Sequence, residues 1–267
     1  MGYPRSGTTF LQSLLLNFEE VESFPETHFF HYLIQGNYFQ RKLKIVSSRS
    51  LKKIQFLLAD KNNFSSWLIS YNKATACFIK DLDEKTLRAN KRIWVEKTPG
   101  HLHIIKLIER YVDNPLFIHI IRNPVNAITS LHKVTTNYPV SWGGARSVNN
   151  CMNRWIEDVR ISLDMIKKKQ NHHLIIYDKL VTQTKTEMDK IAAFLSINSL
   201  PGYDHTKYAS KIVEPHEPWK NRNFLEVVPQ TGYEVEHTLS VMDIKMIHNA
   251  TRLLYQEVLD IESINYQ

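Results

Sequence analysis

The sequence has little of what marks a secreted, membrane-spanning or repetitive protein. Its 267 residues include two cysteines, Cys77 and Cys151, which match no disulfide framework and no metal-binding spacing. Its apolar runs stop well short of the roughly 20 residues that a membrane-spanning helix needs. No charged-then-apolar leader opens the chain, and no repeat or Gly/Ser/Pro-rich linker divides it. We therefore expect one cytoplasmic α/β domain over residues 1–267, with reduced thiols that are buried or half-buried.

The charge balance is basic, with 34 Lys and Arg against 27 Asp and Glu and a net charge of +7. An excess of this size fits anionic ligands such as nucleotides, polyanionic sugars or nucleic acid, but many proteins without such ligands share it. Hydrophobic residues make up 43% of the chain, an ordinary globular proportion that argues against long disorder. Composition alone does not choose among these ligands.

The most informative segment is the opening run from Gly2 to Thr9, Gly-Tyr-Pro-Arg-Ser-Gly-Thr-Thr. Two glycines separated by four residues have the spacing of a phosphate-binding loop, in which several backbone N–H groups approach one anion. The apolar residues that follow predict a helix whose N-terminal dipole also favours an anion. The lysine usual in such loops is missing, since Thr8 stands in its place and the cation is Arg5. The loop therefore predicts binding of nucleotide phosphate, but not as a magnesium–triphosphate hydrolase binds it.

Such a loop normally follows a buried strand, yet only Met1 precedes Gly2. We expect the first strand to be missing because the chain is N-terminally truncated. The best strand is the continuous apolar run Leu116–Ile121, which ends at Arg122 and is followed by a helix-capping Asn-Pro.

Strands and helices alternate along the chain, which indicates a doubly wound parallel sheet with helices on both faces. The expected elements are an aromatic-rich helix or lid over 26–41, a helical insertion over about 45–90, a strand at Ile93–Val95, a helix opened by Pro99, a helix over Asn150–Lys168, a strand at Leu174–Tyr177, and helices over Thr182–Leu195 and Leu239–Leu259.

The opening loop, taken together with Ile121-Arg122-Asn123-Pro124 and the later Ser130, resembles the sulfotransferases that use 3′-phosphoadenosine 5′-phosphosulfate (PAPS). The resemblance implies a P-loop, nucleotide-kinase-like fold. It also implies that the loop holds the 5′-phosphosulfate and that Arg122 and Ser130 hold the 3′-phosphate. Eight residues of α-helix rise roughly 12 Å, so the role of Ser130 rests on the resemblance and not on spacing.

Four further segments resemble the branch that contains tyrosylprotein, bacterial and heparan-type sulfotransferases. The first implies a catalytic Glu26 within Pro-Glu-Thr-His, with His28 beside it. The second places Lys97 of Glu-Lys-Thr-Pro at the reacting sulfuryl group, and the third places Tyr177 beside the nucleotide. The fourth implies a basic residue near Lys220 over the 3′-phosphate. The implied donor-binding residues are Pro4, Arg5, Ser6, Gly7, Thr8, Thr9, Arg122, Ser130, Tyr177, Lys220 and Arg222.

The chemistry can be argued separately. Sulfuryl transfer needs cations around the sulfuryl oxygens and the departing phosphate, and a base for the acceptor hydroxyl. Arg5, Lys97 and the loop amides can supply the first, and Glu26 the second. The resemblance also implies His28 as a base in place of Glu26, because the cytosolic branch of the family uses a histidine. We expect no metal, because fixed cations can serve and because the best strand ends in Arg122 where a magnesium-binding phosphotransferase often places Asp.

Structural alternatives stay open for these residues. Glu26 also fits a helix-start carboxylate, Lys97 a solvated loop lysine, and Tyr177 a packing residue. Lys220 and Arg222 also fit a solvated basic run.

The predicted activity is in-line transfer of a sulfuryl group from PAPS to a hydroxyl (EC 2.8.2 type), leaving adenosine 3′,5′-bisphosphate. The alternatives are a P-loop small-molecule kinase and a catalytically inactive nucleotide-binding relative. We expect the acceptor to be a small molecule, a glycan or a peptide, and we expect no nucleic-acid partner. The sequence does not define an oligomeric state.

Overall fold

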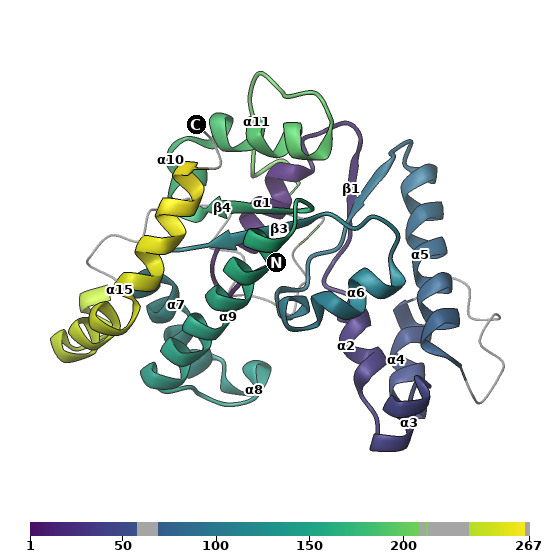
Figure 1. Cartoon of the computed structure of the whole chain (residues 1–267), viewed down its shortest axis with the longest axis horizontal. Helices are drawn as coiled ribbons and strands as arrows, with labels where there is room; N and C mark the ends of the chain where they lie inside the picture. Colours follow the sequence, from purple (N-terminus) through teal and green to yellow (C-terminus); the bar gives the residue numbers. More distant parts are fainter. Residues whose placement is uncertain (58–68, 209–211, 213–234, 265–267) are drawn as a thin grey trace. The chain divides into compact units, whose positions relative to one another are not determined.

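The computed structural model describes residues 1–57, 69–208, 212 and 235–264 (Figure 1). Contacts between residues divide the chain into two compact units. Unit 1 is Met1–Asn17 together with Leu116–Gln267, and unit 2 is Phe18–Pro115. Each unit is described by itself.

Unit 1 is built on a parallel strand pair, β3 (Phe117–Ile121) and β4 (His172–Ile176). The two strands pair in register over their full length, from Phe117 opposite His172 to Ile121 opposite Ile176. The helices of this unit are α1 (Thr8–Leu15), α7 (Pro124–Asn137), α8 (Pro139–Trp142), α9 (Val148–Lys168), α10 (Tyr177–Thr182), α11 (Thr184–Leu195) and α15 (Val241–Ile264).

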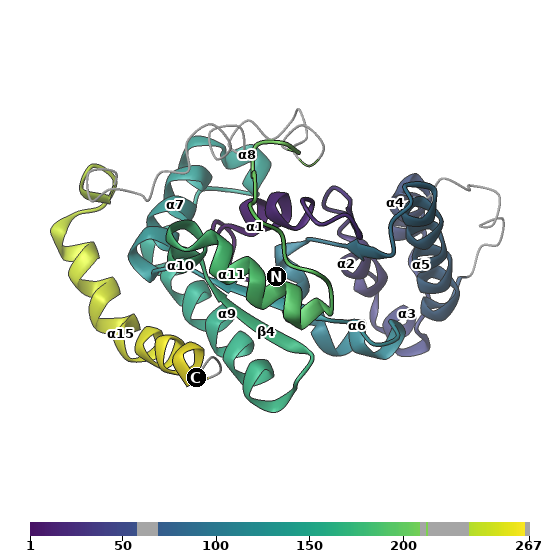
Figure 2. The same ribbon diagram turned by 90° about the horizontal axis from the view of Figure 1, so that it is seen from above.

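Helices cover both faces of β4. Leu174 and Ile176 belong to a core cluster that contains Trp155 of α9. On the opposite face, which alternation assigns to odd positions, His173 stacks on Phe194 of α11 with ring centroids 4.9 Å apart. The ribbon of α11 lies beside β4 (Figure 2). All five residues of β4, His172 and His173 included, are buried, as expected for a strand covered on both faces.

The backbone of Met1 extends the sheet beside β3. Its amino group donates to the carbonyl of Ile118, and its carbonyl accepts from the N–H of Ile120 at 3.0 Å, the pattern of a parallel bridge. Gly2 then passes so close to β3 that a Cβ in its place would lie 2.4 Å from the Ile120 carbonyl oxygen. The loop therefore begins at the edge position where a phosphate-binding loop is expected.

Unit 2 pairs β1 (Val21–Ser23) with β2 (Ile93–Val95) in parallel. Its aromatic core stacks Phe29 on Phe78 with centroids 3.9 Å apart. The helices are α2 (Phe29–Ile34), α3 (Tyr38–Leu43), α4 (Ser48–Leu57), α5 (Tyr71–Arg88), the 3₁₀ helix η2 (Pro99–Ile104) and α6 (Ile105–Tyr111).

The α/β class with parallel strands is confirmed, and most predicted elements are present. The helix expected over 26–41 is two helices, because Asn37 forms a capping box with Gln40 and starts α3 anew. The helix opened by Pro99 begins as a 3₁₀ helix, and Tyr177 begins α10 instead of ending β4. Strand β1 was not predicted, because three residues carry too little periodicity.

Cys151 is buried and Cys77 half-buried, and both are free thiols, as predicted. Among the described residues, no helix combines the length and the apolar character needed to cross a membrane. The single-domain boundary over 1–267 stays a prediction.

We expect that replacing His173 with Phe will flatten the acid dependence of stability. Burial, with help from the nearby Lys190, lowers the pKa of His173 from 6.5 to about 4. The unfolded chain therefore binds the proton first, so stability is fully present above about pH 6.5 and is lost as the pH falls towards 4. Urea denaturation at pH 7 and pH 5 should show the unaltered protein losing on the order of 1–2 kcal/mol more than His173→Phe, which keeps the stacking on Phe194.

The exposed Asn249 provides the control, since Asn249→Gln removes no titratable group and should leave the pH dependence unchanged. Equal losses in the unaltered protein and in His173→Phe would contradict the assignment.

Candidate functional site

The glycine-rich loop of unit 1 has a conformation that few side chains tolerate. Arg5 has φ +71° and Gly7 has φ +94°, both in the left-handed region. Gly7 is the N-cap of α1, and no side chain caps this helix end. A Cβ on Gly7 would lie 2.2 Å from Cδ2 of Tyr177, so only glycine lets the ring lie against the loop. The amides at the start of α1 are thus presented at a helix N-terminus, as anion binding requires.

Arg122 leaves the end of β3 and reaches the loop. Its Nη1 donates to the carbonyl of Arg5 at 3.2 Å, and its guanidinium lies 4.3 Å from the centre of the Tyr177 ring. Its own carbonyl accepts a hydrogen bond from Nε1 of the fully buried Trp155 at 3.3 Å. The next residue, Asn123, is the side-chain cap of α7 and donates its N–H to Asp178. The strand end is therefore held on both sides of Arg122.

Ser130 joins this group through the loop. It is buried on α7, and its Oγ accepts from Nε of Arg5 at 3.2 Å. Helix rise alone did not place Ser130 near Arg122, but Arg5 contacts both residues. The structure brings together Arg5, Ser6, Gly7, Arg122, Ser130 and Tyr177 in unit 1, with Pro4, Thr8 and Thr9 on the same loop and helix start.

Two polar atoms of this cluster have no hydrogen-bond partner within the described part of the chain. They are Oγ of Ser6, whose residue is fully buried, and Nε of Arg122, whose residue is 7% exposed. An unpaired buried donor costs about 1–3 kcal/mol, which a bound acceptor would offset. Two such donors beside a helix N-terminus are suited to an anion.

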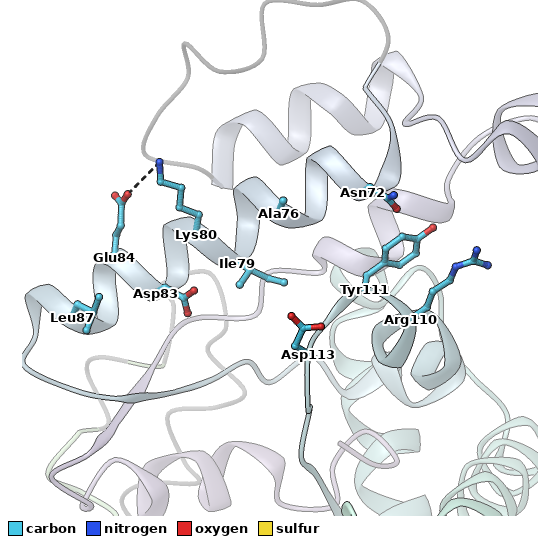
Figure 3. A pocket seen from close by; sticks show the side chains of 10 residues that line it. All are labelled: Asn72, Ala76, Ile79, Lys80, Asp83, Glu84, Leu87, Arg110, Tyr111 and Asp113. Atoms are coloured by element: carbon cyan, nitrogen blue, oxygen red, sulfur yellow. Dashed lines mark ion pairs between the residues drawn. The ribbon is translucent and has the colours of Figure 1, made fainter.

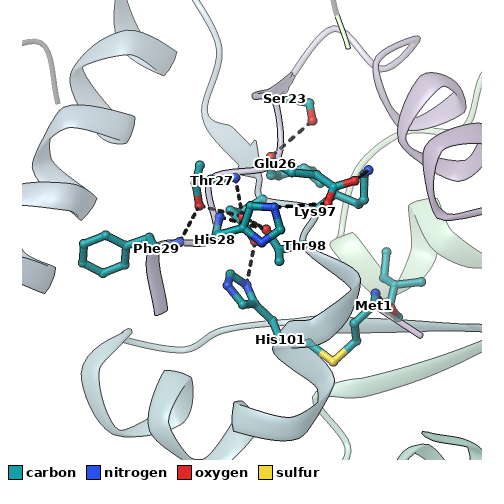
Figure 4. Close-up of polar contacts among 12 residues, drawn as sticks. Met1, Ser23, Glu26, Thr27, His28, Phe29, Lys97, Thr98 and His101 are labelled. Atoms are coloured by element: carbon teal, nitrogen blue, oxygen red, sulfur yellow. Dashed lines mark hydrogen bonds and ion pairs between the residues drawn. The ribbon is translucent and has the colours of Figure 1, made fainter. Parts of the chain in front are cut away.

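Unit 2 carries a second polar cluster (Figure 4). Lys97, 6% exposed, forms an ion pair with Oε1 of Glu26, and Nε2 of His28 lies 3.8 Å from Oε2 of the same carboxylate. Glu26 precedes α2, and Lys97 follows β2. The three residues predicted for catalysis from these segments therefore form one group.

His28 has an unusual backbone and a shifted pKa. Its φ is +52°, a left-handed conformation at the N-cap of α2. Burial lowers the pKa of His28 below its ordinary value of 6.5, against the raising effect of Glu26. The imidazole is thus neutral at pH 7 and able to accept a proton or a hydrogen bond.

Sequence reasoning gave no role to Glu96, although it quoted the segment that contains it. The carboxylate accepts from the hydroxyl of Thr27 at 2.7 Å, from the hydroxyl of Thr98 at 2.6 Å and from Nδ1 of His101 at 2.9 Å. Burial alone raises the pKa of Glu96, but His101 and the hydrogen bonds outweigh it and lower the pKa to about 2. A signal was present in the sequence, since the carboxylate is flanked by the apolar β2 and the helix-opening proline and is followed by a histidine five residues later.

Two of the predicted residues, Lys220 and Arg222, lie outside the described residues. Over the described ranges, no group of three or more His, Cys, Asp or Glu side chains is arranged to hold a metal ion. A separate open hollow of about 600 Å³ in unit 2 is lined by α5 residues and by Arg110, Tyr111 and Asp113 (Figure 3). Its lining includes none of the predicted site residues.

The family of the chain follows from its sequence. The model of the Sulfotransferase family matches residues 1–201, so the chain belongs to this family and is a sulfotransferase. No curated protein matches the sequence at a significant level.

Two solved structures share the fold. The sulfotransferase domain of the curacin biosynthetic pathway is 19% identical, with 90% of this chain and 95% of that chain covered and a TM-score of 0.50. The sulfotransferase domain of the olefin synthase of Synechococcus PCC 7002 is 18% identical, with 94% and 92% covered and a TM-score of 0.54. At these identities the likeness establishes the fold alone.

The loop geometry predicts that Gly7→Ala destabilises unit 1. The new methyl group meets the Tyr177 ring at 2.2 Å on a backbone with positive φ, so the loop or the ring must move, at a cost of about 1–3 kcal/mol. Gly202→Ala is the matched control, because a Cβ there meets nothing within 4 Å. Urea unfolding of both variants measures the difference, and equal midpoints would show that the ring does not constrain Gly7.

Proposed function

We propose that this sulfotransferase uses PAPS as donor and transfers the sulfuryl group to a hydroxyl acceptor. The observation that carries the donor assignment is the loop cluster, in which Arg5, Arg122 and Ser130 contact one another while two buried donors stay unpaired. The Gly2–Gly7 loop and the start of α1 would hold the 5′-phosphosulfate. Arg122 and Ser130 would hold the 3′-phosphate.

The fixed cations fit the charge of this donor. A guanidinium at a strand end suits a phosphate dianion, because it offers several donors and keeps its charge at any physiological pH. The orphaned Nε of Arg122 supplies one further N–H for a phosphate oxygen. Tyr177, which stacks on that guanidinium, would fix its plane. Lys220 and Arg222 remain proposed for the 3′-phosphate from the resemblance alone.

For the chemical step, Glu26 would accept the proton of the acceptor hydroxyl as its oxygen attacks sulfur. The bond from sulfur to the phosphate oxygen breaks in line, and adenosine 3′,5′-bisphosphate leaves. Lys97 would neutralise charge on the sulfuryl oxygens, as its buried ammonium pairs with Glu26 before the reaction. His28 is the alternative base, since it is neutral and lies 3.8 Å from Glu26. The acceptor would be a small molecule, a glycan or a peptide.

Binding of adenosine 3′,5′-bisphosphate tests the donor site. Titration calorimetry should show tight binding that does not depend on Mg²⁺. Arg122→Gln should weaken it by about 10- to 100-fold, because a charge-assisted hydrogen bond contributes about 1.5–3 kcal/mol. Arg252→Gln, an exposed position on α15, should bind like the unaltered protein. A lack of binding would overturn the proposal. Magnesium-stimulated consumption of ATP would also overturn it and would favour a kinase.

Substitution of the base tests the chemical step. Glu26→Gln keeps the side-chain volume but cannot take a proton, so kcat should fall by about 10²- to 10⁴-fold while the bisphosphate still binds. Glu19→Gln, at an exposed position of the same unit, is the control. Turnover can be followed with labelled PAPS and a panel of hydroxyl acceptors. Retained activity in Glu26→Gln together with loss in His28→Asn would assign the base to His28.

A further inference from the structure

The segments that carry Glu26 and Lys97 are joined through one buried carboxylate. The side chain of Glu96 is 7% exposed and accepts hydrogen bonds from both segments: from the N–H and the hydroxyl of Thr27 at 3.3 and 2.7 Å, and from the hydroxyl of Thr98 at 2.6 Å. These partners alternate in sequence with the reactive groups. Thr27 lies between Glu26 and His28, and Lys97 lies between Glu96 and Thr98.

The two threonine hydroxyls carry the connection further. Each hydroxyl has one proton, and each donates it to Glu96. Their lone pairs are thereby directed at the first amides of α2: Thr98 accepts from the N–H of His28 at 3.2 Å, and Thr27 accepts from the N–H of Phe29 at 3.2 Å. The left-handed backbone of His28 is thus held by a hydrogen bond whose direction Glu96 determines.

We propose that Glu96 is a positioning residue, which fixes the turn bearing Glu26 and His28 against the segment bearing Lys97 without touching substrate. This inference rests on the proposed function and adds to it the residue that holds the base and the cation in register. The ion pair of Lys97 with Glu26 depends on both segments, so a shift of either moves the acid–base group. A misplacement of about 1 Å can cost about 10²-fold in rate.

The charge of Glu96 is suited to this task. Its contacts keep the carboxylate ionised over the whole working range of pH, so it accepts hydrogen bonds and never donates them. His101, 3% exposed, holds the other carboxylate oxygen through Nδ1 at 2.9 Å. The ring of His101 stacks on the ring of His31 with centroids 5.2 Å apart, so the partner of this second carboxylate oxygen is itself held in place.

Two substitutions of one threonine provide the sharpest test. Thr98→Val removes the hydroxyl but keeps the shape, and it breaks the link between Glu96 and the His28 amide. Thr98→Ser keeps the hydroxyl and should restore the link. We expect Thr98→Val and Glu96→Ala to lower kcat by about 10- to 100-fold, Thr98→Ser to stay within about threefold, and the Kd for adenosine 3′,5′-bisphosphate to stay unchanged in all three.

The measurements separate positioning from bulk stability. Turnover is expressed per bisphosphate-binding site, so unfolded protein does not count, and thermal unfolding is recorded alongside. Variants that lose Tm but keep kcat per binding site would overturn the proposal, as would Thr98→Ser failing like Thr98→Val. Failure of the proposed function itself has a different signature, in which the unaltered protein neither binds the bisphosphate nor transfers sulfate. If Glu96→Ala does not fold, the threonine pair alone decides.

Discussion

The hydrogen bond from the Arg122 guanidinium to the Arg5 carbonyl is the contact on which unit 1 most depends. It ties the end of β3 to the loop, and Arg5, so held, reaches Ser130 on α7. The bond is possible only because Gly2 lets the loop leave the sheet edge against the backbone of β3. One strand end thereby organises groups that the chain separates by more than a hundred residues.

The unpaired buried donors indicate which kind of ligand this arrangement suits. A core normally pairs its polar atoms, since each unpaired one costs about 1–3 kcal/mol. Ser6 and Arg122 depart from that rule beside a helix N-terminus, while Trp155 and Asp178 satisfy the backbone around them. The backbone on both sides of Arg122 is thus held by hydrogen bonds, and the two unpaired side-chain atoms lie beside the helix N-terminus where an anion would bind.

In unit 2 the group that connects the segments is a carboxylate, whereas in unit 1 it is a guanidinium. Its reactive groups lie on two short segments with little regular structure, a turn before α2 and the chain after β2. A single ionised carboxylate, Glu96, accepts hydrogen bonds from both segments, and its side chain is 7% exposed. Its desolvation is offset by those donors and by His101. The sequence carried only an indirect signal for Glu96, because one of its partners, Thr27, lies in a distant segment.

The sequence by itself determined the local elements and the type of chemistry. Features that depend only on neighbours in the chain were predictable. They are the continuous apolar runs, the Asn-Pro start of α7 and the spacing of Gly2 and Gly7. Three local features were missed: the strand β1, the break before α3 and the helical start at Tyr177. These elements are only three to six residues long, and such short segments carry weak periodicity.

Only the tertiary structure decided which side chains meet. Ser130 reaches Arg5, and Tyr177 lies on Gly7 and Arg122, because the parallel pairing of β3 with β4 brings distant strand ends to one edge. In the same way, Glu96 became a centre of contacts through the pairing of β1 with β2. Contacts of this kind arise from packing between distant segments, which local patterning does not encode.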